Sequence, residues 1–155
     1  MARNARWIVL GLVILTAGLA ALAYGYNALG GFGAAAGLDP TDRDKVALGA
    51  TIYAANCASC HGADLQGQPD WRRRRADGRL PAPPHDADGH TWHHPGAQLF
   101  ELTKFGPAAL AGGGYQSDMP AYEGILSDDE IWAVLSFIKS RWPAEVRARH
   151  DQIAR

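Results

Sequence analysis

The chain has very few sulfur-containing residues, and none of its segments alternates apolar and polar residues as a half-buried strand would. It contains 2 cysteines and 2 methionines among 155 residues, and one methionine is the initiator. Two cysteines are too few for the multi-disulfide framework of small secreted domains. Without period-two alternation, no strand is predicted.

An excess of charge of either sign is also missing. The chain has 15 basic and 16 acidic residues, for a formal net charge of −1. No basic helix occurs, and a near-neutral balance gives no electrostatic footprint for nucleic acid. Nucleic acid is therefore excluded as an expected partner.

Residues 7–23, near the N-terminus, carry no charge and almost no polar side chain. Extended to Tyr26, this run reaches about 20 residues, the length that a helix needs to cross a bilayer. One interpretation is a membrane anchor over residues 1–26, and the other is a secretory signal with an Ala-Leu-Ala cleavage pattern at residues 21–23. The run is longer than a usual signal core and Tyr24 is suitably placed for the interface, so we favour the anchor.

The charges that flank this run predict its orientation. Arg3 and Arg6 precede it and no acidic residue does, so the N-terminus should stay inside and the rest should be exported. We expect a single-pass protein of a bacterial inner membrane with its main domain in the periplasm. Residues 27–40, which are rich in glycine and alanine, are predicted to form a flexible linker.

Three helices are predicted in the exported part. The first is capped by Asp39 or Thr41 and runs to the cysteines, and a shorter helix covers residues 95–106. The last has the strongest signal, with Ser127 and Glu130 forming a capping box before an apolar stripe.

Between the first two helices lies a long segment, residues 62–95, that is full of Gly, Pro, Arg, Asp and His. A structureless loop of this length is unusual inside a compact domain. So few helical residues could hardly bury an adequate core by themselves. The pattern indicates that a large cofactor fills the middle of the domain.

The segment NCASCHGADL, residues 56–65, contains both cysteines. Cys57, Cys60 and His61 form Cys-x-x-Cys-His, the attachment pattern of c-type haem, and one helical turn brings the three together. A zinc half-site would need further ligands from other histidines, and a thioredoxin-like pair belongs in a βαβ pattern that is absent. One covalently bound haem c is therefore the favoured cofactor.

A haem held by His61 requires a sixth ligand or an open site. Met119, the one internal methionine, lies in the polar segment SDMPAYEG. A methionine often only fills a gap in a core, but a polar turn next to Pro120 is a poor place for that role. A thioether opposite histidine raises the reduction potential and suits electron transfer. His61 and Met119 are therefore the predicted metal ligands.

With CASCH, DMPAY and the helices at its two ends, the chain resembles a class I cytochrome c over about residues 43–142. With the apolar run before it as an N-terminal transmembrane helix, the resemblance implies an all-α fold of about three to five helices around one haem. It gives a haem domain at residues 41–142 and a C-terminal tail at residues 143–155. It also implies a six-coordinate haem attached through Cys57 and Cys60.

In that family the first and last helices cross closely. The matching positions here are Gly49, Tyr53, Val134 and Phe137. The resemblance further implies that the carbonyl of Pro83 accepts a hydrogen bond from His61, which would fix the orientation of the imidazole.

The function implied is one-electron transfer, not enzymatic catalysis, and no small-molecule substrate is expected. Partners would be the membrane and redox proteins such as a quinol–cytochrome c oxidoreductase or a terminal oxidase. Two alternatives stay open: a haem subunit of a larger oxidase or dehydrogenase, and a gas-binding sensor in which Met119 leaves the iron.

Two clusters in the long loop allow more than one interpretation. The arginines of WRRRRADGR, with Trp71, could neutralise a haem propionate or steer docking, or could simply be solvated. Four histidines could bind a second metal such as copper, although loop histidines more often face water. They are His85, His90, His93 and His94.

Overall fold

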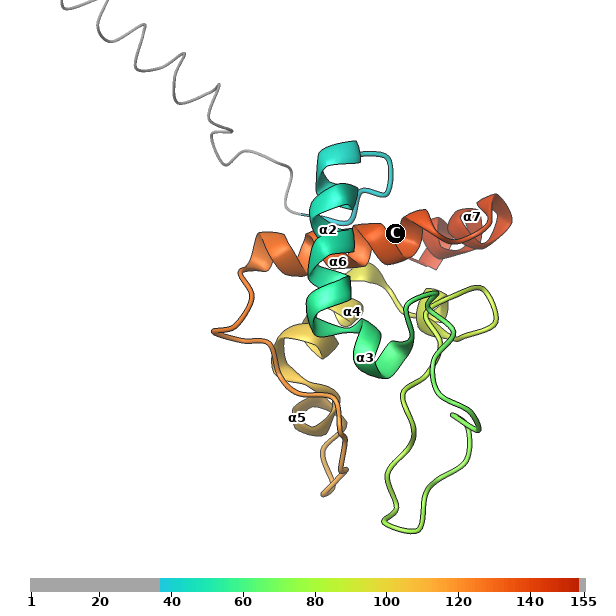
Figure 1. Cartoon of the computed structure of the whole chain (residues 1–155), viewed down its shortest axis with the longest axis vertical. Coiled ribbons are helices and arrows are strands. Elements are labelled where there is room, and N and C mark those ends of the chain that lie inside the picture. The colour runs from blue at the N-terminus through green and yellow to red at the C-terminus, as the bar shows by residue number, and fades with distance from the viewer. Residues whose placement is uncertain (1–36, 154–155) are drawn as a thin grey trace, which may run out of the picture. The chain divides into compact units, whose positions relative to one another are not determined.

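The computed structural model describes residues 37–153, and these residues form helices and loops without a strand. The elements in chain order are α2 (Arg43–Asn56), α3 (Ala58–His61), the 3-10 turn η1 (Thr91–His93), α4 (Gly96–Phe105), α5 (Pro107–Ala111), α6 (Asp128–Ser140) and α7 (Ala144–Ile153) (Figure 1). The predicted all-α fold is confirmed. The predicted anchor, residues 1–26, lies outside the described residues, and none of the helices within residues 37–153 is long and apolar enough to span a bilayer.

The N-cap of α2 is Asp42, so the prediction of Asp39 or Thr41 is wrong by a few residues. The Asp42 carboxylate accepts hydrogen bonds from the backbone N–H groups of Asp44 and Lys45 at 3.1 and 3.0 Å. It thereby satisfies donors that the first turn of a helix leaves free. The Asp39 carboxylate instead accepts from the N–H and the hydroxyl of Thr41, which closes the turn before the helix.

The two main helices, α2 and α6, cross in close contact (Figure 1). The contact is possible because position 49 is glycine: a Cβ atom there would lie 2.0 Å from the carbonyl oxygen of Ala133. Tyr53 and Phe137 pack beside the crossing with their ring centroids 5.4 Å apart. The predicted crossing is confirmed, with Ala133 as the point of closest backbone approach.

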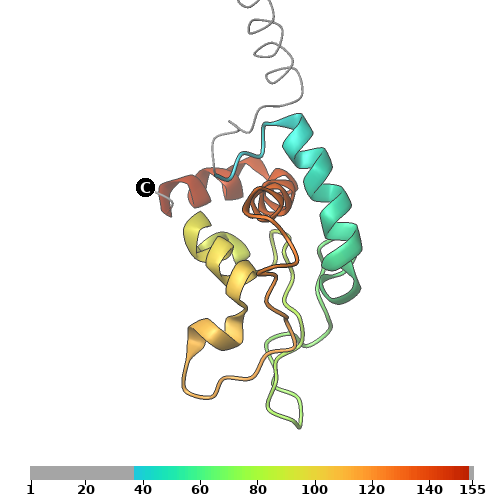
Figure 2. The ribbon, with the colours of Figure 1, turned by 90° about the vertical axis from the view of Figure 1, so that its left-hand side faces the viewer.

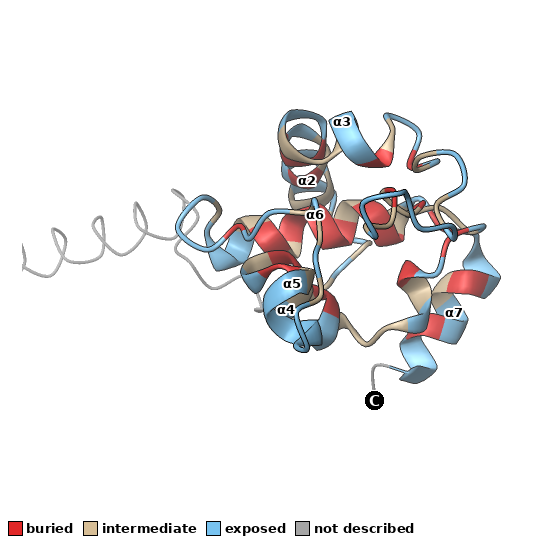
Figure 3. Cartoon of the chain, turned by 90° about the horizontal axis from the view of Figure 1, so that it is seen from below, coloured by how far each residue is buried: buried red, intermediate tan, exposed pale blue. Residues whose placement is uncertain are grey.

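Helix α6 begins at the predicted capping box. The Ser127 hydroxyl accepts from the Glu130 N–H, and the Glu130 carboxylate accepts from the Ser127 N–H. The buried face of α6 contributes to two clusters (Figure 3). The larger cluster includes Tyr53, Val134 and Trp142, and the smaller one joins Leu99 of α4 to Ile131 and Leu135.

The C-terminal segment is helical, whereas the sequence predicted only a tail. Val146 of α7 joins the larger core cluster, and Lys139 of α6 forms an ion pair with Asp151 of α7. The helix also contacts η1. Residues beyond Pro143 therefore support the end of the long loop that the sequence left without structure.

Two loops extend from the helices on the same side of the molecule (Figure 1 and Figure 2). One joins α3 to η1, and the other runs from α5 to α6. Each of them carries residues that the sequence assigned to the site.

Candidate functional site

The two cysteines and the histidine of the CASCH segment lie on one tight turn. Cys57 caps the end of α2, and Cys60 and His61 belong to α3. The N–H of His61 donates to the carbonyl of Cys57 at 2.9 Å. The two cysteines form no disulfide with each other; Cys57 is half-buried and Cys60 is exposed. Burial raises the pKa of the Cys57 thiol to about 11.

His61 has a fixed orientation. Its side chain is buried, and its Nδ1 lies 2.8 Å from the carbonyl oxygen of Pro83. A carbonyl can only accept, so Nδ1 carries the proton and Nε2 keeps its lone pair. Burial lowers the pKa of His61, and the bond to Pro83 opposes this shift. The imidazole is thus held in its neutral form with the lone pair of Nε2 available, and this is the form that binds a metal.

The segment that carries Pro83 is tied back to the CASCH turn. The N–H of Gly67 donates to the carbonyl of His61 at 2.7 Å, and the N–H of Gln68 donates to that of Ala82 at 2.9 Å. Gly67 has φ +68°, and a Cβ atom there would lie 2.5 Å from the nitrogen of Pro84. A glycine is therefore required where the two segments pass.

His85 belongs to the site, and sequence reasoning missed it by grouping it with the loop histidines. Its ring stacks on His61 with centroids 4.0 Å apart, and its Nδ1 lies 2.8 Å from the hydroxyl of Thr91. The indole N–H of Trp142 donates to its carbonyl at 2.7 Å. Burial lowers the pKa of His85. The sequence offered one indication of this role: His85 follows Pro83 by only two positions.

The other loop histidines lie elsewhere. His90 stacks with Trp71, and His93 stacks with Trp92. Within residues 37–153 no group of three or more His, Cys, Asp or Glu side chains could hold a metal ion. The described part of the chain gives no support to the alternative of a copper site in this loop.

Met119 lies half-buried in the loop between α5 and α6. Its backbone N–H donates to the hydroxyl of Ser117 at 3.1 Å. Three residues further on, the hydroxyl of Tyr122 donates to the carbonyl of Asn56 at 2.7 Å. This bond brings the loop of Met119 beside the residue that precedes Cys57.

The side chains present fit a haem. Two thiols can form the covalent links of a c-type haem, and one imidazole with a free Nε2 and one thioether can bind its iron. Arg79 adds a buried Nε that has no hydrogen-bond partner among the described residues, and a propionate would supply the missing acceptor. Trp71 instead lies beneath the guanidinium of Arg72 at 4.2 Å from its ring centroid.

An all-α domain with this turn of two thiols and an oriented imidazole defines a c-type haem protein. The family model for cytochrome c matches residues 46–142, and the chain belongs to the cytochrome c family. It therefore carries covalently bound haem c and has a haem-based role in electron transfer. Comparison with curated proteins and comparison with solved structures gave no match.

Proposed function

We propose that the chain is a membrane-tethered electron carrier of the periplasm with one haem ligated by His61 and Met119. The observation that carries the proposal is the hydrogen bond from His61 Nδ1 to the Pro83 carbonyl at 2.8 Å. This bond leaves the lone pair of Nε2 free to bind iron. His61 directly follows the second of two cysteines at haem-attachment spacing.

Each of these residues would have a separate task. Cys57 and Cys60 would form the thioether links to the haem, and His61 Nε2 and the Met119 sulfur would bind its iron. When bound, the haem supplies a one-electron Fe(II)/Fe(III) couple. The protein raises its potential through the thioether and through burial, and it keeps solvent and other ligands from the iron.

The tether is proposed from the sequence of residues 1–26. Their uncharged run is long enough to cross a bilayer, and Arg3 and Arg6 favour an inside N-terminus. Tethering would confine the carrier near membrane redox complexes, such as a quinol–cytochrome c oxidoreductase and a terminal oxidase in a bacterial inner membrane. If it is correct, the full chain resists extraction by alkaline carbonate, whereas a chain beginning at Asn27 does not.

The visible spectrum of the purified protein tests the ligand set. The reduced protein should show a c-type α band, and the oxidised protein should show the weak charge-transfer band of methionine bound to ferric iron. Rapid binding of carbon monoxide by the reduced protein at neutral pH would contradict the proposal and favour a gas sensor.

The variant Met119→His tests the assigned sulfur ligand. We expect it to lose the methionine–iron band and to lower the reduction potential on the order of 0.1 V or more, out of the about 0.8 V that axial ligands cover. The matched control is Gln116→His, which places the same imidazole at an exposed position of the same loop. The assignment fails if Met119→His keeps the band or if the control loses it.

A further inference from the structure

The loop that carries Met119 is joined to a second loop by one carboxylate. Residues 112–121, the methionine loop, face residues 70–79, the basic loop. Asp118 Oδ2 lies 2.7 Å from Arg75 Nη1, and Asp118 Oδ1 lies 2.7 Å from Arg79 Nη1. Both carboxylate oxygens are therefore engaged, each by a different guanidinium group.

Directly after the methionine loop, Tyr122 is anchored by its N–H to Thr103 and Lys104 and by its hydroxyl to Asn56, but residues 112–121 themselves have few bonds to other segments. Within the described part of the chain, the two bonds to Asp118 are the hydrogen bonds that join residues 112–121 to another segment; the remaining ones are internal to the loop. The loop also starts with three glycines, all with positive φ, and glycine gives a chain little stiffness. Between the glycines and Tyr122, the bonds of Asp118 therefore hold the part of the loop that carries Met119.

The basic loop is in turn fixed to the histidine side of the site. Arg75 Nη2 donates to Gln68 Oε1 at 2.8 Å, and the same oxygen accepts from the N–H of Ala82 at 3.0 Å. Ala82 precedes Pro83, whose carbonyl accepts from His61. A continuous polar chain thus runs from the predicted histidine ligand to the residue next to the predicted methionine ligand.

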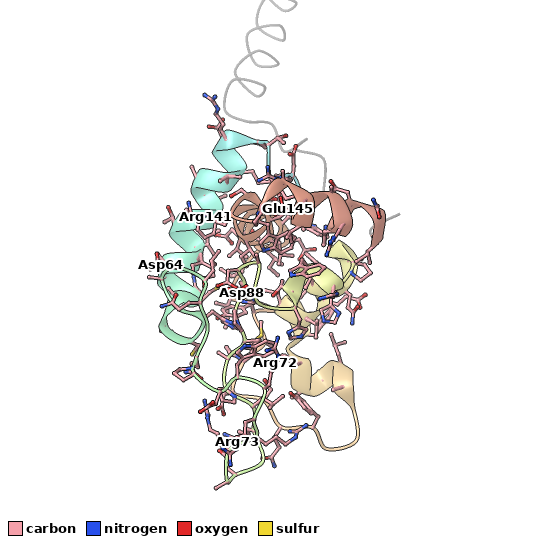
Figure 4. All side chains as sticks on the ribbon, turned by 90° about the vertical axis from the view of Figure 1, so that its right-hand side faces the viewer. Asp64, Arg72, Arg73, Asp88, Arg141 and Glu145 are labelled. Carbon is pink, nitrogen blue, oxygen red and sulfur yellow. The ribbon has the colours of Figure 1, made fainter. Side chains whose placement is uncertain are left out.

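Arg74 of the basic loop also lies over the ring of Tyr115 in the methionine loop, 5.7 Å from its centroid, whereas Arg73 takes no part in the contact between the loops. The tip of the loop extends away from the helices, and Arg73 lies on it (Figure 4). Its side chain makes no hydrogen bond or ion pair in the described structure, and Arg73 is exposed. A mutation of Arg73 therefore changes the charge of the basic loop without removing a contact with Asp118.

We propose that Asp118 is a positioning residue, and that its paired contact with Arg75 and Arg79 determines how firmly Met119 is held on the iron. The proposal rests on the ligation by Met119 proposed above. A single exposed ion pair contributes little. Here one carboxylate joins two arginines, and Arg75 is already held by Gln68, so less side-chain freedom is lost when the pair forms.

Competition by imidazole for the ferric iron of the holoprotein tests this role. Asp118→Asn removes the charge with little change of shape, and we expect it to tighten imidazole binding about fivefold or more. Asp77→Asn is the matched control, because the Asp77 carboxylate lies in the basic loop and accepts only from the N–H of Arg79, without a contact to the methionine loop. Arg75→Gln should act like Asp118→Asn, and Arg73→Gln should act like the wild type.

The outcomes separate this inference from the proposed function. A wild-type protein without the methionine–iron band contradicts the ligation by Met119 itself. A wild-type protein with the band, but an Asp118→Asn variant with unchanged imidazole affinity, overturns the positioning role alone. The role is also overturned if Asp77→Asn changes the affinity as much as Asp118→Asn, because the effect would then be one of general charge.

Discussion

At the scale of single residues, His150 has unfavourable surroundings for a charged side chain. Its side chain is 1% exposed, its ring lies 5.2 Å from that of Trp142, and neither ring nitrogen has a hydrogen-bond partner among the described residues. Burial lowers the pKa of His150, and Lys139 adds to the effect. The backbone of His94 and the carboxylate of Asp151 oppose it.

This environment predicts a loss of stability in mild acid. Because the folded protein binds a proton at His150 less readily than the unfolded chain, stability falls as the pH drops below about 6.5. The slope from this residue is at most about 1.4 kcal/mol per pH unit. His150→Phe should flatten the dependence of the unfolding free energy on pH between neutral pH and pH 5, as measured by denaturant unfolding of the holoprotein.

The exposed His93 provides the control for this prediction. His93→Gln should keep the pH dependence of the wild type, because the His93 side chain is exposed and its replacement removes no buried group. Equal slopes for wild type and His150→Phe would show that burial of His150 has no consequence for stability.

At the scale of elements, the helices with strong local signals could be predicted and the others could not. Ser127 and Glu130 lie in a pattern that specifies a helix start without help from the rest of the chain. Helix α7 has no comparable signal, and its buried residues Val146 and His150 pack against other elements. Tertiary contacts stabilise a helix of this kind, so its sequence alone does not reveal it.

The crossing of α2 and α6 gives a prediction at this scale. Gly49→Ala places a Cβ atom 2.0 Å from the Ala133 carbonyl oxygen, and the helices must separate. We expect a net loss of about 1–3 kcal/mol or more in the free energy of unfolding, although alanine by itself favours a helix by about 1 kcal/mol over glycine. Thermal or denaturant unfolding of the holoprotein measures the difference.

Gly96→Ala is a control of the same chemistry in another helix. A Cβ atom at position 96 would meet its nearest neighbour at 3.7 Å, which is an ordinary contact. This variant should be neutral or slightly stabilised. If both variants unfold alike, the close approach at Gly49 does not limit the packing of the two helices.

At the scale of the whole molecule, the polypeptide core is small for a domain with so long a loop. The smaller core cluster has only three buried residues, Leu99, Ile131 and Leu135. No helix occurs from residue 62 to residue 90. Domains with so little buried surface usually need a further source of stability, and we expect haem binding to provide it here, as metal binding stabilises small metalloproteins.

The double variant Cys57→Ala/Cys60→Ala should therefore lose its cooperative thermal transition. We expect the loss to reach about 5 kcal/mol, comparable to the whole stability of a small domain. Circular dichroism during heating measures it, and Ser59→Ala, an exposed position in the same turn, is the control. A double variant that melts like the wild type would show that the polypeptide core suffices.

The sequence by itself determined the haem-attachment turn, the main helices and the methionine loop, because each depends on residues that are close in the chain. The hydrogen bond from His61 to Pro83 followed only from the family resemblance, and the structure confirms it. Only the tertiary structure decided that His85 stacks on His61, that α7 supports the long loop, and that Asp118 joins the two loops. These contacts link residues far apart in sequence, and no local pattern specifies which distant side chain fills a given space.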